Sequence, residues 1–139
     1  MPIVLEIVTP MAKVYSEKVE SVVLPTLQGE VGILPGHIPL MTMLEAGELQ
    51  VAKTGGGKEL LAVDKGFAEV KSDQVTVVTE AAINVDSIDL SDVEEARFRA
   101  EAALKAASDQ QMDPEEVERL EAQVNWAVAQ LNIKKKKTL

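Results

Sequence analysis

Hydrophobic and polar side chains alternate with a period of two residues along the first part of the chain. Every second residue of segment 3–7 is apolar, and Leu49 and Val51 are each preceded by a polar residue. This period is typical of strands that bury one face, and Gly, Pro and Ser-Asp turn signals separate the runs. Segments 22–25 and 37–44 are apolar almost throughout, as in strands that are buried on both faces. The pattern predicts an antiparallel β-sandwich or barrel.

Near Asp86 the hydrophobic period changes to that of amphipathic helices. Ser91 and Glu94 have the spacing of a capping box, which marks the start of a first helix. Its apolar stripe consists of Val93, Ala96, Ala100, Ala103, Leu104 and Ala107. Asp113 followed by Pro114 predicts the cap and first turn of a second helix. The stripe of that helix consists of Val117, Leu120, Val124, Ala127, Val128 and Leu131.

These two periods predict a two-part α+β fold. Residues 1–86 are expected to form the β-sandwich and residues 87–139 an antiparallel two-helix hairpin. Because the first stripe is nearly all alanine, and a buried methylene contributes roughly 0.8 kcal/mol, the helices should hold each other only moderately. Phe98 and Trp126 lie away from the stripes. They either pack against the sandwich or await a partner protein.

The composition narrows the class of partner. A formal net charge of −9 argues against nucleic acid as a partner. The chain has no cysteine, so it holds no disulfide or thiolate metal site. Its N-terminus lacks the basic start of a signal peptide, and no apolar run reaches the length of a membrane span. The four consecutive lysines at 134–137 are typical of a solvated tail, or of a contact for acidic protein or anionic lipid.

Little in the sequence supports catalysis. His37 is the single histidine and has no acidic residue within four positions, so a structural or interface role is expected for it. Because the chain also lacks cysteine and a Gly-x-Ser-x-Gly motif, no catalytic residue, metal site or cofactor is expected. Segment 54–59 lacks the first glycine and the final Ser or Thr of a phosphate-binding loop, and it is interpreted as a hairpin turn. The Gly-x-x-Gly that starts at Gly29 contains Glu30, which would repel phosphate.

Residues 29–49, GEVGILPGHIPLMTMLEAGEL, closely resemble the signature of the epsilon subunit of F-type ATP synthases. In that family G-x-x-G-I-L-x-G-H-x-P-L recurs, followed by G-x-L. Further similarity lies in the early apolar strand, in segment 66–70 (GFAEV), in segment 75–78 (VTVV) and in segment 127–131 (AVAQL). The resemblance therefore covers nearly the whole chain.

The resemblance implies a non-catalytic rotor subunit in the central stalk. The sandwich would bind the gamma subunit and sit on the ring of c subunits, and the hairpin would extend among the alpha and beta subunits to restrain ATP hydrolysis. The protein would lie on the cytoplasmic face of a bioenergetic membrane, either a bacterial inner membrane or a thylakoid, and would touch the membrane only through the complex.

The same resemblance implies two groups of contact residues. The loop toward the c ring would present Glu30, Gly32, Pro35, Gly36, His37 and Pro39. The hairpin would use Arg97, Phe98, Arg99, Arg119, Trp126, Lys134 and Lys135 toward its partners.

One motif departs from the family. Some members bind ATP through Ile/Leu-Asp-x-x-Arg-Ala at the start of the first helix. Here Ile88 and Asp89 are in place and Arg99 matches a later arginine, but Asp92 stands where the motif has arginine. A carboxylate facing a triphosphate is repulsive, so weak or absent ATP binding is expected.

Two other interpretations use the C-terminal lysines. In one, the chain is a free-standing adaptor that binds acidic protein surfaces, and in the other it is a peripheral binder of anionic lipid. Both assign the affinity to residues 134–137, whereas the epsilon interpretation requires a gamma subunit as partner.

Overall fold

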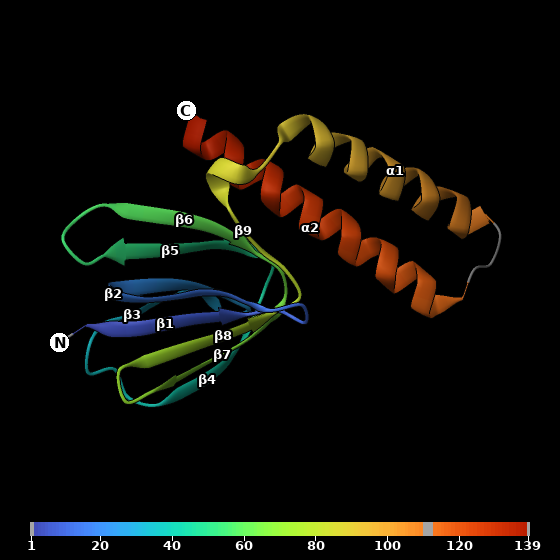
Figure 1. Cartoon of the computed structure of the whole chain (residues 1–139). Coiled ribbons are helices and arrows are strands. Elements are labelled where there is room, and N and C mark those ends of the chain that lie inside the picture. The colour runs from blue at the N-terminus through green and yellow to red at the C-terminus, as the bar shows by residue number, and fades with distance from the viewer. Residues whose placement is uncertain (1, 110–112, 139) are drawn as a thin grey trace. The chain divides into compact units, whose positions relative to one another are not determined.

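The structure is a computed structural model that describes residues 2–109 and 113–138 (Figure 1). The chain divides into two compact units, Met1–Asn84 and Val85–Leu139. The strands of the first unit are β1 (Ile3–Val8), β2 (Lys13–Thr26), β3 (Gly29–Ile33), β4 (Leu40–Leu44), β5 (Gly47–Lys53), β6 (Lys58–Val63), β7 (Gly66–Lys71), β8 (Gln74–Thr79) and β9 (Ala82–Asn84). The second unit holds η1 (Val85–Ser87), α1 (Leu90–Asp109) and α2 (Pro114–Thr138). The predicted two-part fold, a β-sandwich followed by a helical hairpin, is confirmed.

The strands pair in the order β1-β8-β7-β4-β2-β5-β6-β9, with β3 on β2. In Figure 1, β5 and β6 lie in one layer of the sandwich, and β1, β8, β7 and β4 lie in the other. The long strand β2 serves both layers, because it pairs with β1 near its start and with β3 and β5 near its end. One pair departs from the predicted antiparallel pattern: β1 runs parallel to β8.

The inward faces of both layers are aliphatic, as the period of two predicts. On β1 the side chains of Ile3, Leu5 and Ile7 are at most 1% exposed, and on β8 Val75 and Val77 are fully buried. Burying an Ile, Leu or Val side chain contributes about 1.5–3 kcal/mol each, so these strands form the centre of the core.

A β-bulge lets β2 change the face that it buries. Val19 and Val22 are both buried although they lie three residues apart. The register against β5 shifts between Val19 and Ser21, so an extra residue lies between them. Because side chains alternate along a strand, this extra residue moves the buried set from odd to even positions. A strict period of two does not predict this shift.

Segment 37–44 differs from its expected burial on both faces. The strand covers only Leu40–Leu44, and its outward residues Met41 and Met43 are 64% and 57% exposed. Only one face of β4 therefore belongs to the core.

A polar network joins β2, β6 and β9 at the end of the sandwich unit. The Tyr15 hydroxyl donates to Glu59 at 3.0 Å, and the Asn84 amide donates to the other Glu59 oxygen at 2.6 Å. Burial, and then the hydrogen bond to Glu59, raise the pKa of the Tyr15 hydroxyl well above its usual value. The network fixes Asn84, the last residue of β9.

In the second unit, α1 and α2 lie side by side (Figure 1). The seam buries Ala100 and Ala107 of α1, and Leu120, Ala127 and Leu131 of α2. The cap of α1 differs from the expectation: Asp89, and not Ser91, accepts from the backbone, at 3.1 Å from the Asp92 nitrogen. Both residues have the N-cap chemistry, and the helix begins at Leu90, two residues earlier than the capping box implies.

The cap of α2 is as expected. The Asp113 carboxylate accepts from the Glu115 nitrogen at 3.0 Å, and Pro114 occupies the first helical position.

We predict that Gly66→Ala strongly destabilises the sandwich. A Cβ at Gly66 would overlap the carbonyl oxygen of Val78 and lie 2.8 Å from the Thr79 Cα, so the β7–β8 backbone would have to separate. The expected loss is at or above the top of the roughly 1–3 kcal/mol range for overpacked sites, measured by urea unfolding. Gly32→Ala is the matched control, because a Cβ at this strand glycine meets nothing within 4 Å. Equal stability of the two variants would contradict the prediction.

Candidate functional site

The segment between β3 and β4 forms a tight, exposed turn. The His37 nitrogen donates to the Leu34 carbonyl at 3.1 Å, and Gly36 has φ of 83°. Pro35 precedes this glycine, and this order of residue types is favoured in type II turns, whose third residue needs a positive φ. The glycine and the proline therefore shape the turn, as expected from the sequence. The turn displays two large apolar side chains, with Leu34 65% and Ile38 75% exposed.

His37 is half-buried and its ring is held locally. Its Nδ1 lies 2.6 Å from the Ile38 carbonyl oxygen, a contact in which a protonated Nδ1 donates. This contact leaves Nε2 as the nitrogen available to a partner. Among the described residues, the Ile38 carbonyl is the hydrogen-bond partner of the His37 ring.

The turn between β7 and β8 lies beside this loop. Ser72 and Asp73 both have positive φ, 50° and 62°, as in the two-residue turns that connect hairpin strands. The Asp73 carboxylate accepts a hydrogen bond from the Gly36 nitrogen at 2.8 Å, although the residues are 37 positions apart. This bond brings two segments that are distant in the sequence to one end of the sandwich.

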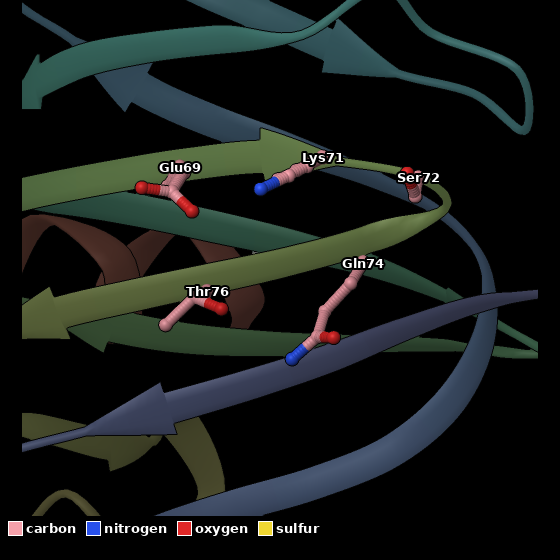
Figure 2. A pocket seen from close by; sticks show the side chains of 5 residues that line it. All are labelled: Glu69, Lys71, Ser72, Gln74 and Thr76. Atoms are coloured by element: carbon pink, nitrogen blue, oxygen red, sulfur yellow. The ribbon is translucent and has the colours of Figure 1, made fainter.

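A shallow polar hollow lies next to this turn on the outer face of β7 and β8. It has a volume of about 280 Å³ and is lined by Glu69, Lys71, Ser72, Gln74 and Thr76. Figure 2 shows Glu69 and Lys71 on β7, Gln74 and Thr76 on β8, and Ser72 at the turn. Charges of both signs line it, which gives it no strong preference for an ion.

The other loop residues implied by the resemblance are exposed. Glu30 and Gly32 lie on β3, and Pro35 and Pro39 lie in the connection to β4. They all belong to one continuous segment. The exposed side chains of Leu34 and Ile38 lie in the same segment, but they are not among the contact residues that the resemblance implies.

A row of apolar side chains crosses the outer face of the sandwich. Met43 on β4, Phe67 on β7 and Val78 on β8 are directly opposite one another in the strand register, and Val8 on β1 continues the row. Phe67 is 40% exposed, and Met41 and Leu27 beside the row are exposed as well. We call Met43, Phe67, Val78 and Val8 the outer apolar row. The sequence does not predict this row, because an almost wholly apolar run such as 37–44 is equally typical of a strand that is buried on both faces.

The predicted contact residues of the hairpin have different environments. Phe98 is 74% exposed and Arg99 is exposed, whereas Trp126 is half-buried. Arg97 pairs with Glu101 and Arg119 pairs with Glu116, each at 2.7 Å within its own helix. Such exposed pairs contribute little stability.

The lysine run continues the last helix, because α2 extends through Thr138. Positive charge in a last turn is favoured by the helix dipole. The Lys134 ammonium donates to the Val85 carbonyl of η1 at 3.2 Å, while Lys135 is exposed. The side chains of residues 136 and 137 lie outside the described part of the chain.

Two hollows follow the seam between α1 and α2. The first, of about 250 Å³, is lined by Asp92, Val93, Ala96, Gln123, Trp126, Ala127 and Gln130. The second, of about 420 Å³, is lined by Glu101, Leu104, Lys105, Val117 and Glu121. Both hollows are open to solvent, and the small side chains of the alanine-rich stripe leave room for such grooves beside the seam.

In the described part of the chain, the residues that match the ATP motif have separate environments. Asp92 lines the first hollow, Asp89 caps α1, and Ile88 is buried. Arg99 is not among the residues that line either hollow. The first hollow therefore presents a carboxylate, an indole and two amides, and no cation.

The fold and these surfaces define a class of small two-part proteins, in which a β-sandwich with an exposed loop precedes a helical hairpin. Residues 2–85 match the family model described as ATP synthase, Delta/Epsilon chain, beta-sandwich domain. The ATP synthase epsilon chain of Herpetosiphon aurantiacus is 41% identical over 135 residues, which cover 97% of this chain and 96% of that protein. The epsilon chain of Syntrophobacter fumaroxidans is 42% identical over 95% of both chains. The chain therefore belongs to the ATP synthase epsilon chain family.

Solved structures agree in fold. A chain of the Euglena gracilis mitochondrial ATP synthase, in an assembly of OSCP, F1 and the c-ring, matches with a TM-score of 0.72 and 24% identity. The match covers 99% of this chain and 81% of that chain. A chain of the Tetrahymena thermophila mitochondrial ATP synthase central stalk and c-ring matches with a TM-score of 0.52 and 11% identity, over 63% and 69%. Neither α1 nor α2, as far as the structure describes them, is long and apolar enough to cross a membrane.

We propose that the isolated chain binds ATP weakly or not at all, because the carboxylate of Asp92 stands where the ATP motif of the resemblance has an arginine, and no cation among the described residues lines the hollow beside it. Isothermal titration calorimetry should give no binding at micromolar ATP. Asp92→Arg should strengthen any residual binding, since an arginine pairs with phosphate oxygens. Asp92→Asn is the control that removes the repulsion without adding a cation, and it should have a smaller effect. Micromolar or tighter binding by the unaltered chain would contradict this proposal.

Proposed function

We propose that this chain is the non-catalytic central-stalk subunit of an F-type ATP synthase. Its sandwich couples the gamma subunit to the c ring, and its hairpin restrains ATP hydrolysis through contacts with the alpha and beta subunits. The protein lies on the cytoplasmic face of a bioenergetic membrane and reaches it through the complex. The observation that carries this proposal is the presence of two separate exposed surfaces, the outer apolar row and the loop 34–39, on one small sandwich.

The outer apolar row is suited to a permanent protein partner. Met43 and Phe67 are substantially exposed and lie opposite each other on adjacent strands. Aromatic and methionine side chains are enriched in the buried centres of protein interfaces. Because relatives are epsilon chains and the gamma subunit is the partner that the family resemblance implies, we assign this row to gamma.

The loop 34–39 is suited to a contact that transmits force. Its turn is fixed by proline, by a glycine with positive φ, and by a hydrogen bond to Asp73. It combines apolar tips, Leu34 and Ile38, with the polar group of His37. We assign it to the c ring, where a rigid loop loses little conformational entropy on docking.

The hairpin has the physical properties of a switch. Its seam is alanine-rich on α1 and contains two hollows, so separating the helices exposes less apolar surface than separating a leucine-filled seam. Exposed Phe98 and Arg99 would offer contacts to the alpha and beta subunits once the hairpin extends. The adaptor and lipid-binding alternatives depend on lysines 134–137, and the Lys134 ammonium is already bonded to Val85.

We predict that Phe67→Ser weakens binding of the full chain to purified gamma subunit by roughly thirtyfold, the loss expected for a central aromatic contact. Surface plasmon resonance with immobilised gamma measures this directly. Lys71→Ser is the matched control, since Lys71 lies on the same face of the same strand and is exposed but polar. If Lys71→Ser weakens binding as much as Phe67→Ser does, the outer apolar row is not the gamma contact.

We predict that locking the hairpin relieves its restraint on ATP hydrolysis. Ala96 and Ala127 line one hollow from opposite helices, and the chain has no other cysteine, so Ala96→Cys with Ala127→Cys offers a single disulfide. Oxidised complexes should hydrolyse ATP several-fold faster than reduced ones, within the roughly 5–150-fold range of allosteric couplings. Single-cysteine variants, oxidised in parallel, control for oxidation itself. Equal rates in locked and reduced complexes would reject the inhibitory hairpin.

A further inference from the structure

The loop 34–39 depends for its shape on a residue far along the chain. The Gly36 nitrogen donates to the Asp73 carboxylate at 2.8 Å. Leu34, Pro35 and Gly36 are exposed, so they have little packing of their own to hold them. The turn bond from the His37 nitrogen to the Leu34 carbonyl closes the loop but does not attach it to the sheet.

Asp73 is a rigid acceptor because its own backbone is fixed. It occupies the second position of the β7–β8 turn with φ of 62°, a conformation that Asp, Asn and Gly tolerate better than other residues. Its carbonyl also accepts from the Val4 nitrogen at 2.9 Å, which ties the turn to β1. The neighbours Ser72 and Gln74 line the polar hollow of Figure 2, whereas the Asp73 carboxylate bonds to the loop.

The bond acts on the peptide next to His37. Gly36 has an unusual positive φ, and fixing its N–H restricts the orientation of the turn that presents His37 and Ile38. A hydrogen bond to a charged carboxylate is stronger than one between neutral groups. A loop that is ordered in advance binds a partner with a smaller loss of conformational entropy.

We infer that Asp73 is a positioning residue for the loop 34–39, which holds the Gly36 amide and so keeps the loop in the shape that docks on its partner. The docking role rests on the proposed function. The bond between Asp73 and Gly36 does not, and it can be tested on the isolated protein. An asparagine at position 73 retains a side-chain oxygen that can accept the hydrogen bond. A glycine there tolerates the positive φ of the turn but has no side-chain acceptor.

Amide proton exchange at Gly36, measured by NMR on the full chain, tests the bond. Asp73→Gly removes the acceptor and retains a residue that accepts positive φ, so exchange should accelerate by roughly tenfold to a hundredfold. Asp73→Asn should retain most of the protection. Ser72→Gly is the matched control, because it changes the same turn and leaves the acceptor in place. Unchanged Gly36 exchange in Asp73→Gly, with the chain folded, would overturn the inference.

A second measurement needs no substitution. A scalar coupling across the hydrogen bond, between the Gly36 amide nitrogen and the Asp73 carboxylate carbon, should be detectable in the unaltered chain. Detection supports the bond. Its absence, together with Gly36 exchange at the rate of an unprotected amide, would overturn the inference even if Asp73→Gly failed to fold.

The consequence for docking is tested in the assembled complex. Asp73→Gly should lower ATP-driven proton pumping relative to ATP hydrolysis, Asp73→Asn should restore it, and His37→Ala should lower it independently. If Gly36 protection is lost in Asp73→Gly but coupling survives in both Asp73→Gly and His37→Ala, the bond stands and the proposed c-ring role of the loop fails. If coupling falls in His37→Ala but not in Asp73→Gly, the loop role stands and the positioning role of Asp73 is refuted.

Discussion

The parallel pairing of β1 with β8 is the constraint on which the sandwich depends. β1 hydrogen-bonds to β2 on one edge and to β8 on the other, so the N-terminal strand joins two strands that lie far apart in the sequence. Its inward residues Ile3, Leu5 and Ile7 are in the centre of the core. The same pairing extends beyond the strands, because the Val4 nitrogen bonds to the Asp73 carbonyl and the Asp73 carboxylate bonds to Gly36. A core contact is thereby linked through the β7–β8 turn to the exposed loop.

The two units differ in how completely they are packed. The sandwich has an aliphatic core, and most of its exposed large apolar side chains lie in the outer apolar row and beside it or in the loop 34–39. The hairpin has a seam with alanines on one side and two hollows along it. In the function proposed above, a stable domain with exposed contact surfaces serves the permanent assembly, and a weaker seam serves the opening of the hairpin. These properties follow from side-chain volume: β-branched and leucine residues fill the sandwich, while α1 contributes mostly methyl groups.

Asp92 stands where the ATP motif implied by the resemblance has an arginine, and the structure shows the surroundings of this residue. Asp92 is at the start of α1 and lines the hollow against α2, with Trp126 and Gln130 opposite. Asp89, which the motif shares, serves as the helix cap through its bond to the Asp92 nitrogen. The position that matches the motif, Asp89, is thus explained by helix formation, and the position that differs from it, Asp92, lines the hollow.

The sequence by itself determined the two-part fold, the strands of the first unit and the hairpin of the second, because apolar periods of two and of about 3.6 residues report local geometry. It also indicated the shape of the loop, since Pro35 and Gly36 have intrinsic backbone preferences. Only the tertiary structure decided which apolar side chains are exposed on the surface of the sandwich and which are buried in its core. The run 37–44 contains both core and surface side chains, and periodicity cannot tell a doubly buried strand from one whose outer face awaits a partner. The sequence also does not predict three further features: the bulge in β2, the parallel β1–β8 pair and the Asp73–Gly36 bond. Each of them depends on contacts between segments that are distant in the sequence, and local backbone preferences carry no information about such contacts.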